Sequence, residues 1–331
     1  MDTLQEIDYI LGVINTHPEF HSRYTRSAEQ NKRGALLEDA RRHSLQIEKT
    51  KDGDSYKNLQ QAELYLGTNG LSVSTLSQLG HLTDPEKNGI KGFRNVNPEF
   101  PDTVVEKYAL GELRVQPPVA SKVESQIGNL IFYLNNVADH PVVRAAEAHL
   151  DFVRIHPYAE GNGRVARILQ NFCLTERAYP AAIISADERK VYYGLLQNAL
   201  AERTSTQRFY PGERRKEDQL FIDFIASKVL KSTRDLESEL NKNRAFTVDL
   251  TGHYDPGSIH KLAQIIRRHK VTFQGTKVGI NRKSNRHKGA SLTVIGDVNK
   301  KDLENVISSA HILSRPRYRL SYDVKPLGAT E

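Results

Sequence analysis

Cysteine is nearly absent from the sequence: Cys173 is the single one, so no disulfide can form within the chain. Long apolar runs are also absent, because no segment approaches the roughly 18 residues that a transmembrane helix requires. The first residues are acidic, whereas a secretory signal begins basic and continues apolar. The sequence therefore predicts a cytoplasmic protein with no membrane association. Cys173 falls on the apolar side of an expected helix and should be inert.

Positive charge is concentrated at one end of the chain. Residues 241–331 contain 17 Lys and Arg against 7 Asp and Glu, a net charge of +10, whereas residues 1–240 contain 30 against 33, a net charge of −3. Binding of an acidic partner is therefore a question about the C-terminal segment.

Helical patterns dominate the first 240 residues. Apolar residues recur at spacings of three and four in several segments, which are 34–50, 71–81, 187–203 and 217–240. Gly53 is expected to end the first of these helices. A Gly-rich loop at 88–94 precedes the stretch Val104–Val119, which is typical of a short β-hairpin with a polar turn at Leu110–Glu112.

Two helices are expected to meet at a loop near residue 156. Pro141 suits the first position of a helix, and Pro157 disfavours helical geometry in the residue before it, so this helix should end at His156. The next helix should begin near Gly161 and Asn162.

Strand and helix patterns alternate beyond residue 241. The expected elements, in order, are strand 246–250, helix 258–269, strands 271–280 and 290–295, helix 300–313 and strand 318–324. The order βαββαβ is that of a ferredoxin-like α+β unit. The sequence thus predicts a mainly α protein with three parts: an N-terminal helical region 1–80, a helical catalytic domain 81–240 with the hairpin, and a small basic α+β domain 241–331.

The groups that suggest chemistry lie in the loop and helix start from His156 to Arg167, which reads His-Pro-Tyr-Ala-Glu-Gly-Asn-Gly-Arg-Val-Ala-Arg. A helix N-terminus already carries partial positive charge, so Arg164 and Arg167 are unfavourable there unless an anion binds. Gly161 and Gly163 allow close backbone approach, and Asn162 between them is a donor. The pattern indicates a phosphate-binding site.

Two further residues complete a reaction centre. Glu160 supplies a hard oxygen ligand, and one carboxylate suffices for Mg²⁺ when nucleotide phosphates supply other ligands. His156 has an unperturbed pKa suitable for a general base that accepts the proton of an incoming hydroxyl.

This motif closely resembles the signature of Fic-domain proteins, and the resemblance extends over roughly residues 30–235. It implies a Fic helical bundle and a protein adenylyltransferase that moves AMP from ATP, with Mg²⁺, onto a protein hydroxyl. By the same resemblance His156 is the base, Glu160 holds Mg²⁺, and Gly161, Asn162 and Gly163 form an anion hole. The two arginines, Arg164 and Arg167, would bind the β- and γ-phosphates. Tyr158 stands where phenylalanine is usual and should be a core anchor.

Other segments resemble the family as well. Residues 104–118 are similar to its flap, a hairpin that pairs with the backbone of the protein target by strand addition. Tyr193 matches a tyrosine that helps line the adenine pocket.

A resemblance to the family's inhibitory helix is found at Ser44–Glu48, upstream of the catalytic core. It implies that Glu48 pairs with Arg167 and displaces the γ-phosphate from its productive place. The departure from the pattern is Lys49, where Gly or Asn is usual. Glu48 could alternatively be an exposed carboxylate on a charged helix, or could orient a water that removes AMP from a modified target.

Competing functions were weighed on the same residues. A metallohydrolase using His149, His156 and Glu160 is disfavoured because Pro157 breaks the helical register; His149 is expected at the edge of the core. A Fic-like kinase of the toxin type usually has Lys where Gly163 stands. The phosphate-binding site does not contact the nucleotide base, so nucleotides other than ATP remain possible substrates.

The C-terminal domain leaves a second class of function open. Its charge could bind RNA or DNA, and Arg282–Lys288 is a basic loop, although Phe273 and Tyr318 are too isolated for the paired aromatic motif of RNA-recognition domains. The alternatives are a protein partner and self-association into a homo-oligomer. The alternative reading of the whole chain is a nucleic-acid- or partner-binding regulator with a Fic-like phosphotransfer or de-AMPylation activity.

Overall fold

A computed structural model describes eleven stretches of the chain: 1–50, 53–88, 92–95, 104–108, 111–115, 117–205, 214–252, 256–268, 277–282, 289–310 and 320–327. Within them the chain is mainly helical and forms two compact units. The first contains Met1–Ile7 and Ala35–Thr233, and the second contains Asp8–Gly34 and Arg234–Glu331. The division at residues 80 and 240 that the sequence suggests stays a prediction.

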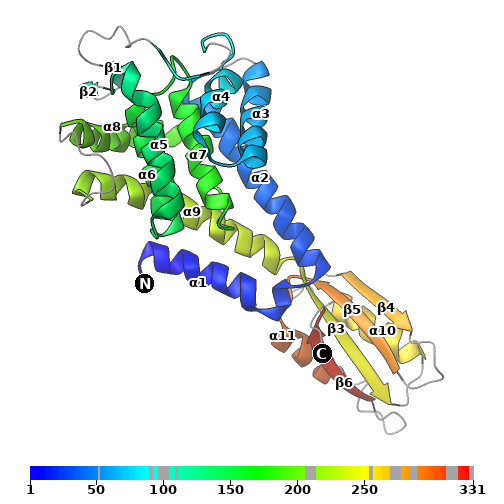
Figure 1. Ribbon diagram of the computed structural model, residues 1–331. Coiled ribbons are helices and arrows are strands. Elements are labelled where there is room, and N and C mark those ends of the chain that lie inside the picture. The colour runs from blue at the N-terminus through cyan, green and yellow to red at the C-terminus, as the bar shows by residue number, and fades with distance from the viewer. Residues whose placement is uncertain are drawn as a thin grey trace. The chain divides into compact units, whose positions relative to one another are not determined.

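The first unit is a helical bundle with one hairpin (Figure 1). Its elements are α3 (Gly53–Asn69), α4 (Val73–Thr83), β1 (Val104–Tyr108), β2 (Gly111–Val115), α5 (Ala120–Asn136), α6 (Pro141–Ile155), α7 (Asn162–Thr175), η2 (Ala186–Glu188) and α8 (Arg189–Ser205). Most of α2 (Arg23–Ile47) and of α9 (Lys216–Asn241) also belongs to it. Helices α6 and α7 pack together and are buried along most of their length, so the loop between them is held on both sides by core helices.

Local signals place the ends of α6 and α7 as expected. Pro141 occupies the first turn of α6, and the His140 ring accepts the Val142 N–H at 3.2 Å. The helix ends before His156, which is left-handed with φ 49°, and Gly161 precedes α7 with φ 82°. A positive φ is cheap for glycine and costly for histidine, so His156 is held there by its surroundings.

The N-terminal helices differ from expectation in three respects. The helix expected at 34–50 is longer, Arg23–Ile47, and Gly53 does not end it. Gly53 instead starts α3, because the chain turns at Lys49 and resumes helical geometry with Asp54 in the favourable first turn. Helix α1 (Thr3–Thr16) has no counterpart among the expected elements.

The hairpin and the C-terminal domain confirm the predicted order of elements. Strands β1 and β2 pair antiparallel from Val104↔Val115 to Tyr108↔Gly111, so Gly111 and Glu112 lie in a strand and not in the turn. The C-terminal elements are β3 (Arg244–Gly252), α10 (Pro256–Arg268), β4 (Lys277–Arg282), β5 (Gly289–Gly296), α11 (Lys300–Ser309) and β6 (Leu320–Pro326).

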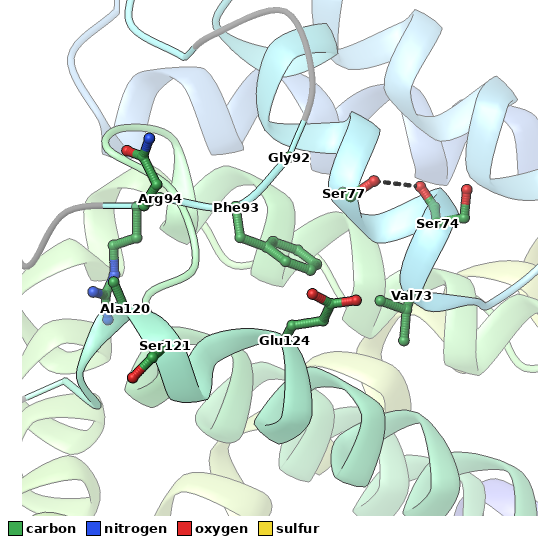
Figure 2. Close-up of a pocket in the computed structure, with 10 residues that line it drawn as sticks. Val73, Ser74, Ser77, Gly92, Phe93, Arg94, Ala120, Ser121 and Glu124 are labelled. Atoms are coloured by element: carbon green, nitrogen blue, oxygen red, sulfur yellow. Dashed lines mark hydrogen bonds between the residues drawn. The ribbon is translucent and has the colours of Figure 1, made fainter.

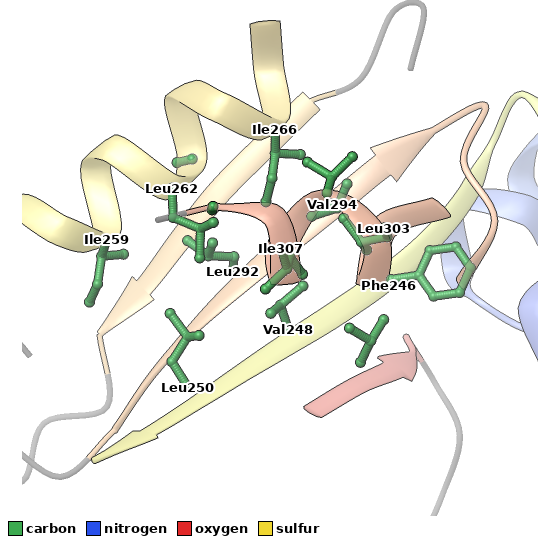
Figure 3. Close-up of a cluster of buried hydrophobic side chains, with 14 of the residues drawn as sticks. Phe246, Val248, Leu250, Ile259, Leu262, Ile266, Leu292, Val294, Leu303 and Ile307 are labelled. Carbon is green, nitrogen blue, oxygen red and sulfur yellow. The ribbon is translucent and has the colours of Figure 1, made fainter. Parts of the chain in front are cut away.

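The four-stranded antiparallel sheet of the second unit has the order β4-β5-β3-β6, which is the ferredoxin-like arrangement. Alternate β3 residues Phe246, Val248 and Leu250 are buried in one apolar cluster with residues of α10 and α11, among them Leu262 and Leu303, as Figure 3 shows. The 3-10 helix η1 (Pro18–Phe20) contacts the start of β3, where Arg244 pairs with Glu19 at 3.3 Å and lies over the Phe20 ring.

Several predicted features lie outside the described residues. They are the middle of the Gly-rich loop (89–91), Leu110, most of the loop after α8 (206–213), the first part of the strand expected at 271–280, the basic loop beyond Arg282, and the aromatic residues Phe273 and Tyr318. Among the described helices, none combines the length and apolar character that a membrane span requires.

Gly80 of α4 lies against the ring of Tyr158, the core anchor of the motif loop. A Cβ at Gly80 would come within 2.4 Å of that ring, whereas a Cβ at Gly67 of α3 would meet nothing within 4 Å. Both glycines are helical, so alanine improves helix propensity at both by up to about 1 kcal/mol.

We expect Gly80→Ala to lower the free energy of unfolding by about 1 to 3 kcal/mol because it overpacks the ring. The matched change Gly67→Ala should raise it by up to about 1 kcal/mol. Urea unfolding of both variants checks the pair, and equal shifts of the same sign would contradict the contact.

Candidate active site

His156 stands at the C-terminal end of α6, and Arg94 ties the backbone around it. The Arg94 side chain donates from Nε to the His156 carbonyl at 2.8 Å and also reaches the carbonyl of Pro118, while its backbone N–H donates to the Pro157 carbonyl at 2.8 Å. The His156 ring is bonded to the Val153 backbone. This clamp explains how a histidine is held at positive φ.

The charge state of His156 is set by burial. Burial and, to a lesser extent, the positive charge of Arg94 lower its pKa to about 4, although the Val153 hydrogen bond acts in the opposite direction. The pKa of His156 is therefore lower than the unperturbed pKa that the sequence suggests. At neutral pH the ring is uncharged and can accept a proton.

The loop from Pro157 to Gly161 is fastened by two asparagine side chains. Asn162 accepts the Tyr158 N–H at 3.0 Å and donates to the Tyr158 carbonyl at 2.9 Å. Asn88 accepts the Glu160 N–H at 3.2 Å and donates to the Glu160 carbonyl at 3.0 Å. The Tyr158 ring is buried, as expected of an anchor, and its hydroxyl donates to the Leu76 carbonyl. The loop is thus rigid, while the Glu160 side chain is exposed.

The first arginine of the motif binds a carboxylate of the same chain. Arg164 Nη2 lies 2.8 Å from Asp84 Oδ2, and Nη1 donates to the Thr83 carbonyl at 3.4 Å. Asp84 follows the end of α4, so the anion that the N-terminus of α7 requires comes here from another helix. Arg164 is itself buried.

The second arginine is enclosed by α2 and α8. Arg167 Nη2 lies 2.6 Å from Glu48 Oε1, its Nε donates to Ser44 Oγ at 2.8 Å, and its Nη1 donates to the Tyr192 hydroxyl at 3.1 Å. A further bond runs from Nη2 to the Ser44 carbonyl at 3.3 Å. Burial alone would lower the pKa of Arg167, but Tyr192 and Glu48 together raise it above its usual value. The guanidinium is charged and its donors are engaged.

Gly163 has no side chain at the place where the Glu48 carboxylate lies. A Cβ on Gly163 would come within 2.8 Å of Glu48 Oε1 and within 3.4 Å of Arg167 Nη1. A side chain at 163 would therefore displace the Glu48 carboxylate from this position, whereas Gly161 is favoured by its backbone angle.

Lys49 is the turning point that brings Glu48 to Arg167. It has φ 56°, its N–H donates to the Gln46 carbonyl at 3.1 Å, and the Thr50 N–H donates to the Leu45 carbonyl at 3.0 Å. These two bonds form a Schellman motif, whose left-handed position normally holds glycine or asparagine. The departure of Lys49 from the resemblance thus has a physical meaning, because a side chain costs about 1 kcal/mol or more in this conformation.

The remaining candidates have different surroundings. Tyr193 is half-buried beside Tyr192, with the Arg189 guanidinium over its ring. Burial and the charge of Glu48 raise the pKa of Tyr193.

His149 is fully buried in the core, and both its ring nitrogens have partners at 2.9 Å, Gln170 and Tyr192. It therefore cannot act as a metal ligand beside His156. Within the described ranges no three His, Cys, Asp or Glu residues lie close enough to hold a metal. Burial also raises the pKa of Cys173 to about 12, which makes its thiol unreactive at neutral pH.

Sequence reasoning missed the residues that hold the motif in place. Arg94, Asn88, Asp84 and Tyr192 come from segments far from the motif, and spacing along the chain carries no sign of their contacts. The weak signal was Arg94, an arginine directly after a Gly-rich loop.

A hollow of about 730 Å³ adjoins the motif loop through Arg94 (Figure 2). Residues of α4, of 92–95 and of the start of α5 line it, and the Phe93 ring and the Glu124 carboxylate face its interior. No residue of the His156–Arg167 motif lines this hollow. The phosphate site expected from the motif is therefore a different place.

Comparisons with known proteins agree with the motif. Residues 72–174 match the model of the Fic/DOC family, so the chain carries a Fic/DOC domain. The chain is 36% identical to a protein adenylyltransferase Fic of Culex quinquefasciatus over 121 residues. This alignment covers 37% of this chain and 22% of that protein. The chain is 48% identical over 60 residues to the protein of the same name of Aedes aegypti, 18% of this chain and 12% of that protein. The alignments thus span less than a quarter of these relatives.

Solved structures share the fold. A Fic domain containing signaling protein from Bacteroides thetaiotaomicron superposes with a TM-score of 0.53 at 15% identity, over 72% of this chain and 98% of that chain. A fragment of Fic-1 from C. elegans gives a TM-score of 0.52 at 18% identity, over 72% of this chain and 71% of that chain.

The Schellman turn generates a test of stability. We expect Lys49→Gly to raise the free energy of unfolding by up to about 1 kcal/mol, because glycine adopts positive φ without a Cβ clash. Gln46→Gly, an exposed site three residues earlier inside α2, should lower it by about 1 kcal/mol. Thermal unfolding of both variants decides, and a loss of stability in Lys49→Gly would refute the assigned turn.

Proposed function

We propose that this chain transfers AMP from ATP to a Ser, Thr or Tyr hydroxyl of a target protein and of itself, and that Glu48 restrains the transfer. The observation that carries the proposal is the placement of an uncharged base, His156, one rigid loop away from a helix N-terminus that carries two buried arginines. The similarity to proteins named protein adenylyltransferase supports the same reaction.

His156 serves as the general base. One ring nitrogen is engaged by the Val153 backbone, and the low pKa leaves the other free of a proton at neutral pH. It accepts the proton of the target hydroxyl while that oxygen forms a bond to the α-phosphorus. The bond from the α-phosphorus to the bridging oxygen breaks, and pyrophosphate leaves with the electron pair. Negative phosphates beside the ring raise its pKa, which strengthens it as a base when nucleotide is present.

Mg²⁺ fits the residues present. Glu160 is an exposed carboxylate on a backbone fixed by Asn88, and the nearby Asp84 is committed to Arg164. A single carboxylate together with waters and nucleotide phosphates is a usual donor set for this ion. When bound, Mg²⁺ would neutralise part of the phosphate charge.

The anion site is formed by the start of α7. Gly161, Asn162 and Gly163 place backbone N–H groups at the helix N-terminus, and Arg164 and Arg167 add charge. The Asn162 side chain is used to hold Tyr158, so its contribution to anion binding is through the backbone. Arg164 keeps donors beyond its bond to Asp84, because a guanidinium has five N–H groups.

Glu48 and Ser44 accept hydrogen bonds from Arg167, the arginine that is proposed to bind the γ-phosphate. Three of the bonds to Arg167 come from these two residues, and a charged carboxylate–guanidinium bond at 2.6 Å in a buried site is strong. An arginine so engaged cannot hold phosphate in the productive position. ATP then binds with its α-phosphate turned away from the attacking hydroxyl.

Protein targets are proposed to dock on the hairpin at 104–118 and to be selected by residues 241–331. On the strand face of the C-terminal sheet Asp249 lies directly across from the exposed Asp323. Lys325 lies on the same face and pairs with Asp323 at 3.4 Å, so this face carries charges of both signs, and a protein partner and a nucleic acid both stay open. Self-association of the chain stays an expectation, as does a cytoplasmic location.

His156→Ala should bind ATP with unchanged affinity but lose transfer, including self-modification, because only the base is removed. Intact mass measurement after incubation with labelled ATP, GTP, UTP and CTP checks this and identifies the nucleotide. Undiminished transfer by His156→Ala would exclude His156 as the base.

Glu48→Gly should raise self-modification by about ten-fold or more, because loss of one ion pair frees Arg167 and each decade of rate corresponds to about 1.4 kcal/mol. Glu38→Gly is the matched control, since Glu38 lies on the same helix and pairs with Arg42 of that helix. Release of AMP from modified protein is measured separately. Equal rates in wild type and Glu48→Gly, with no AMP release by either, would leave Glu48 without a regulatory role.

A further inference from the structure

We infer that Tyr192, His149 and Gln170 form a buried relay that holds Arg167 in position to receive phosphate once the segment Ser44–Glu48 has withdrawn. The inference rests on the proposed function, because it assigns to these residues the positioning of an arginine that binds the nucleotide. The three side chains come from three core helices, α8, α6 and α7.

The partners of Arg167 fall into two groups. Ser44 Oγ, the Ser44 carbonyl and Glu48 Oε1 all belong to the inhibitory segment. In the described part of the chain, the one hydrogen bond to Arg167 that does not come from this segment is the bond of Nη1 to the Tyr192 hydroxyl, at 3.1 Å. When the segment leaves, Tyr192 is what fixes the guanidinium.

The donor chemistry of arginine sets the direction of every bond in the relay. A guanidinium only donates, so the Tyr192 oxygen must accept from Arg167 and its own proton must point elsewhere. That proton has an acceptor in His149 Nε2, 2.9 Å away. His149 must therefore carry its proton on Nδ1, which donates to Gln170 Oε1 at 2.9 Å. The opposite order would leave the tyrosine proton between two donors.

His149 can fill this role at any ordinary pH. Burial and the charge of Arg167 together lower its pKa to about 3, against the effect of the Gln170 hydrogen bond, so the ring stays neutral and Nε2 stays an acceptor. The Phe221 ring lies edge-on to His149 with centroids 5.3 Å apart, and so limits how the imidazole can turn.

One group of the relay, the side-chain amide nitrogen of Gln170, is in an unfavourable environment. The Gln170 Nε2 group is buried without a hydrogen-bond partner among the described residues, because its oxygen faces the histidine. A buried unsatisfied donor is unfavourable, and an apolar residue in its place would avoid the loss. The glutamine is accounted for if its task is to select the His149 tautomer that orients Tyr192.

The test compares variants in the released background Glu48→Gly. Tyr192→Phe removes only the hydroxyl that meets Arg167, and His149→Leu removes the acceptor behind it without contacting Arg167. Affinities for ATP and for AMP are measured by calorimetry in the presence of Mg²⁺. AMP has the base, the ribose and one phosphate but lacks the phosphates that Arg167 is proposed to hold.

Both variants should weaken ATP binding by about ten-fold, the loss of one charge-assisted hydrogen bond, while AMP binding stays within two-fold. His149→Gln, whose amide oxygen can take the place of Nε2, should restore most of the affinity that His149→Leu loses. Tyr133→Phe is the matched control for loss of a buried tyrosine hydroxyl outside the site, since Tyr133 donates to Asp139: it should cost stability but leave both affinities unchanged.

Unchanged ATP affinity in Tyr192→Phe would overturn the inference, and so would equal weakening of ATP and AMP, which marks general damage to the site. If the single variant Glu48→Gly binds ATP but transfers no nucleotide, the proposed function fails, while the ratio of ATP to AMP affinity still decides the relay. A Glu48→Gly protein that binds no ATP would overturn both.

Discussion

The ion pair between Glu48 and Arg167 is the interaction on which the state of this molecule depends. It joins the end of α2 to the first turns of α7, and the Glu48 carboxylate lies where a Cβ at Gly163 would come within 2.8 Å of it. A buried ion pair contributes little stability compared with a pair of apolar residues in the same place. Removing only one partner is costly, because it leaves the other as an unpaired buried charge. Here the partner left behind is an arginine for which phosphate is a natural substitute. Under the proposed function, a phosphate of the nucleotide would replace Glu48 as the partner of Arg167 and offset this penalty.

The two arginines of the motif illustrate different uses of the same chemistry. Arg164 is paired with Asp84 and with a carbonyl of α4, contacts that come from within the Fic/DOC domain and persist whatever α2 does. The hydrogen bonds to Arg167 within the described ranges come from Ser44, Glu48 and Tyr192, all outside residues 72–174. Arg164 is thus oriented from within the domain, whereas under the proposed function Arg167 would exchange its carboxylate partner for phosphate. Two buried arginines three residues apart can have separate functions because their neighbours are separate.

The sequence predicted those features that depend on neighbouring residues. Pro141, Pro157 and Gly161 set the ends of α6 and α7 through backbone geometry, and alternation of strand and helix patterns predicted the ferredoxin-like order of the C-terminal domain. The end of α2 escaped prediction because a lysine fills the left-handed position where glycine is the usual signal. Gly53 was misread for the same reason: a glycine between two polar helices can end one or begin the next. The motif spacing identified the residues that act, but the clamp from Arg94 and the bond from Tyr192 depend on tertiary contacts that no local pattern records.

The left-handed Lys49 has a consequence for the population of released molecules. If, as proposed, Glu48 withdraws together with the last turn of α2, the strain at Lys49 counts against the engaged state alone. About 1 kcal/mol of such strain would change the ratio of engaged to released molecules by about five-fold, although Lys49 is an exposed residue. Under the proposed restraint, the identity of one surface residue would then set the fraction of molecules in which Glu48 is disengaged. Related chains with glycine at this turn would rest more fully engaged while sharing every residue of the motif.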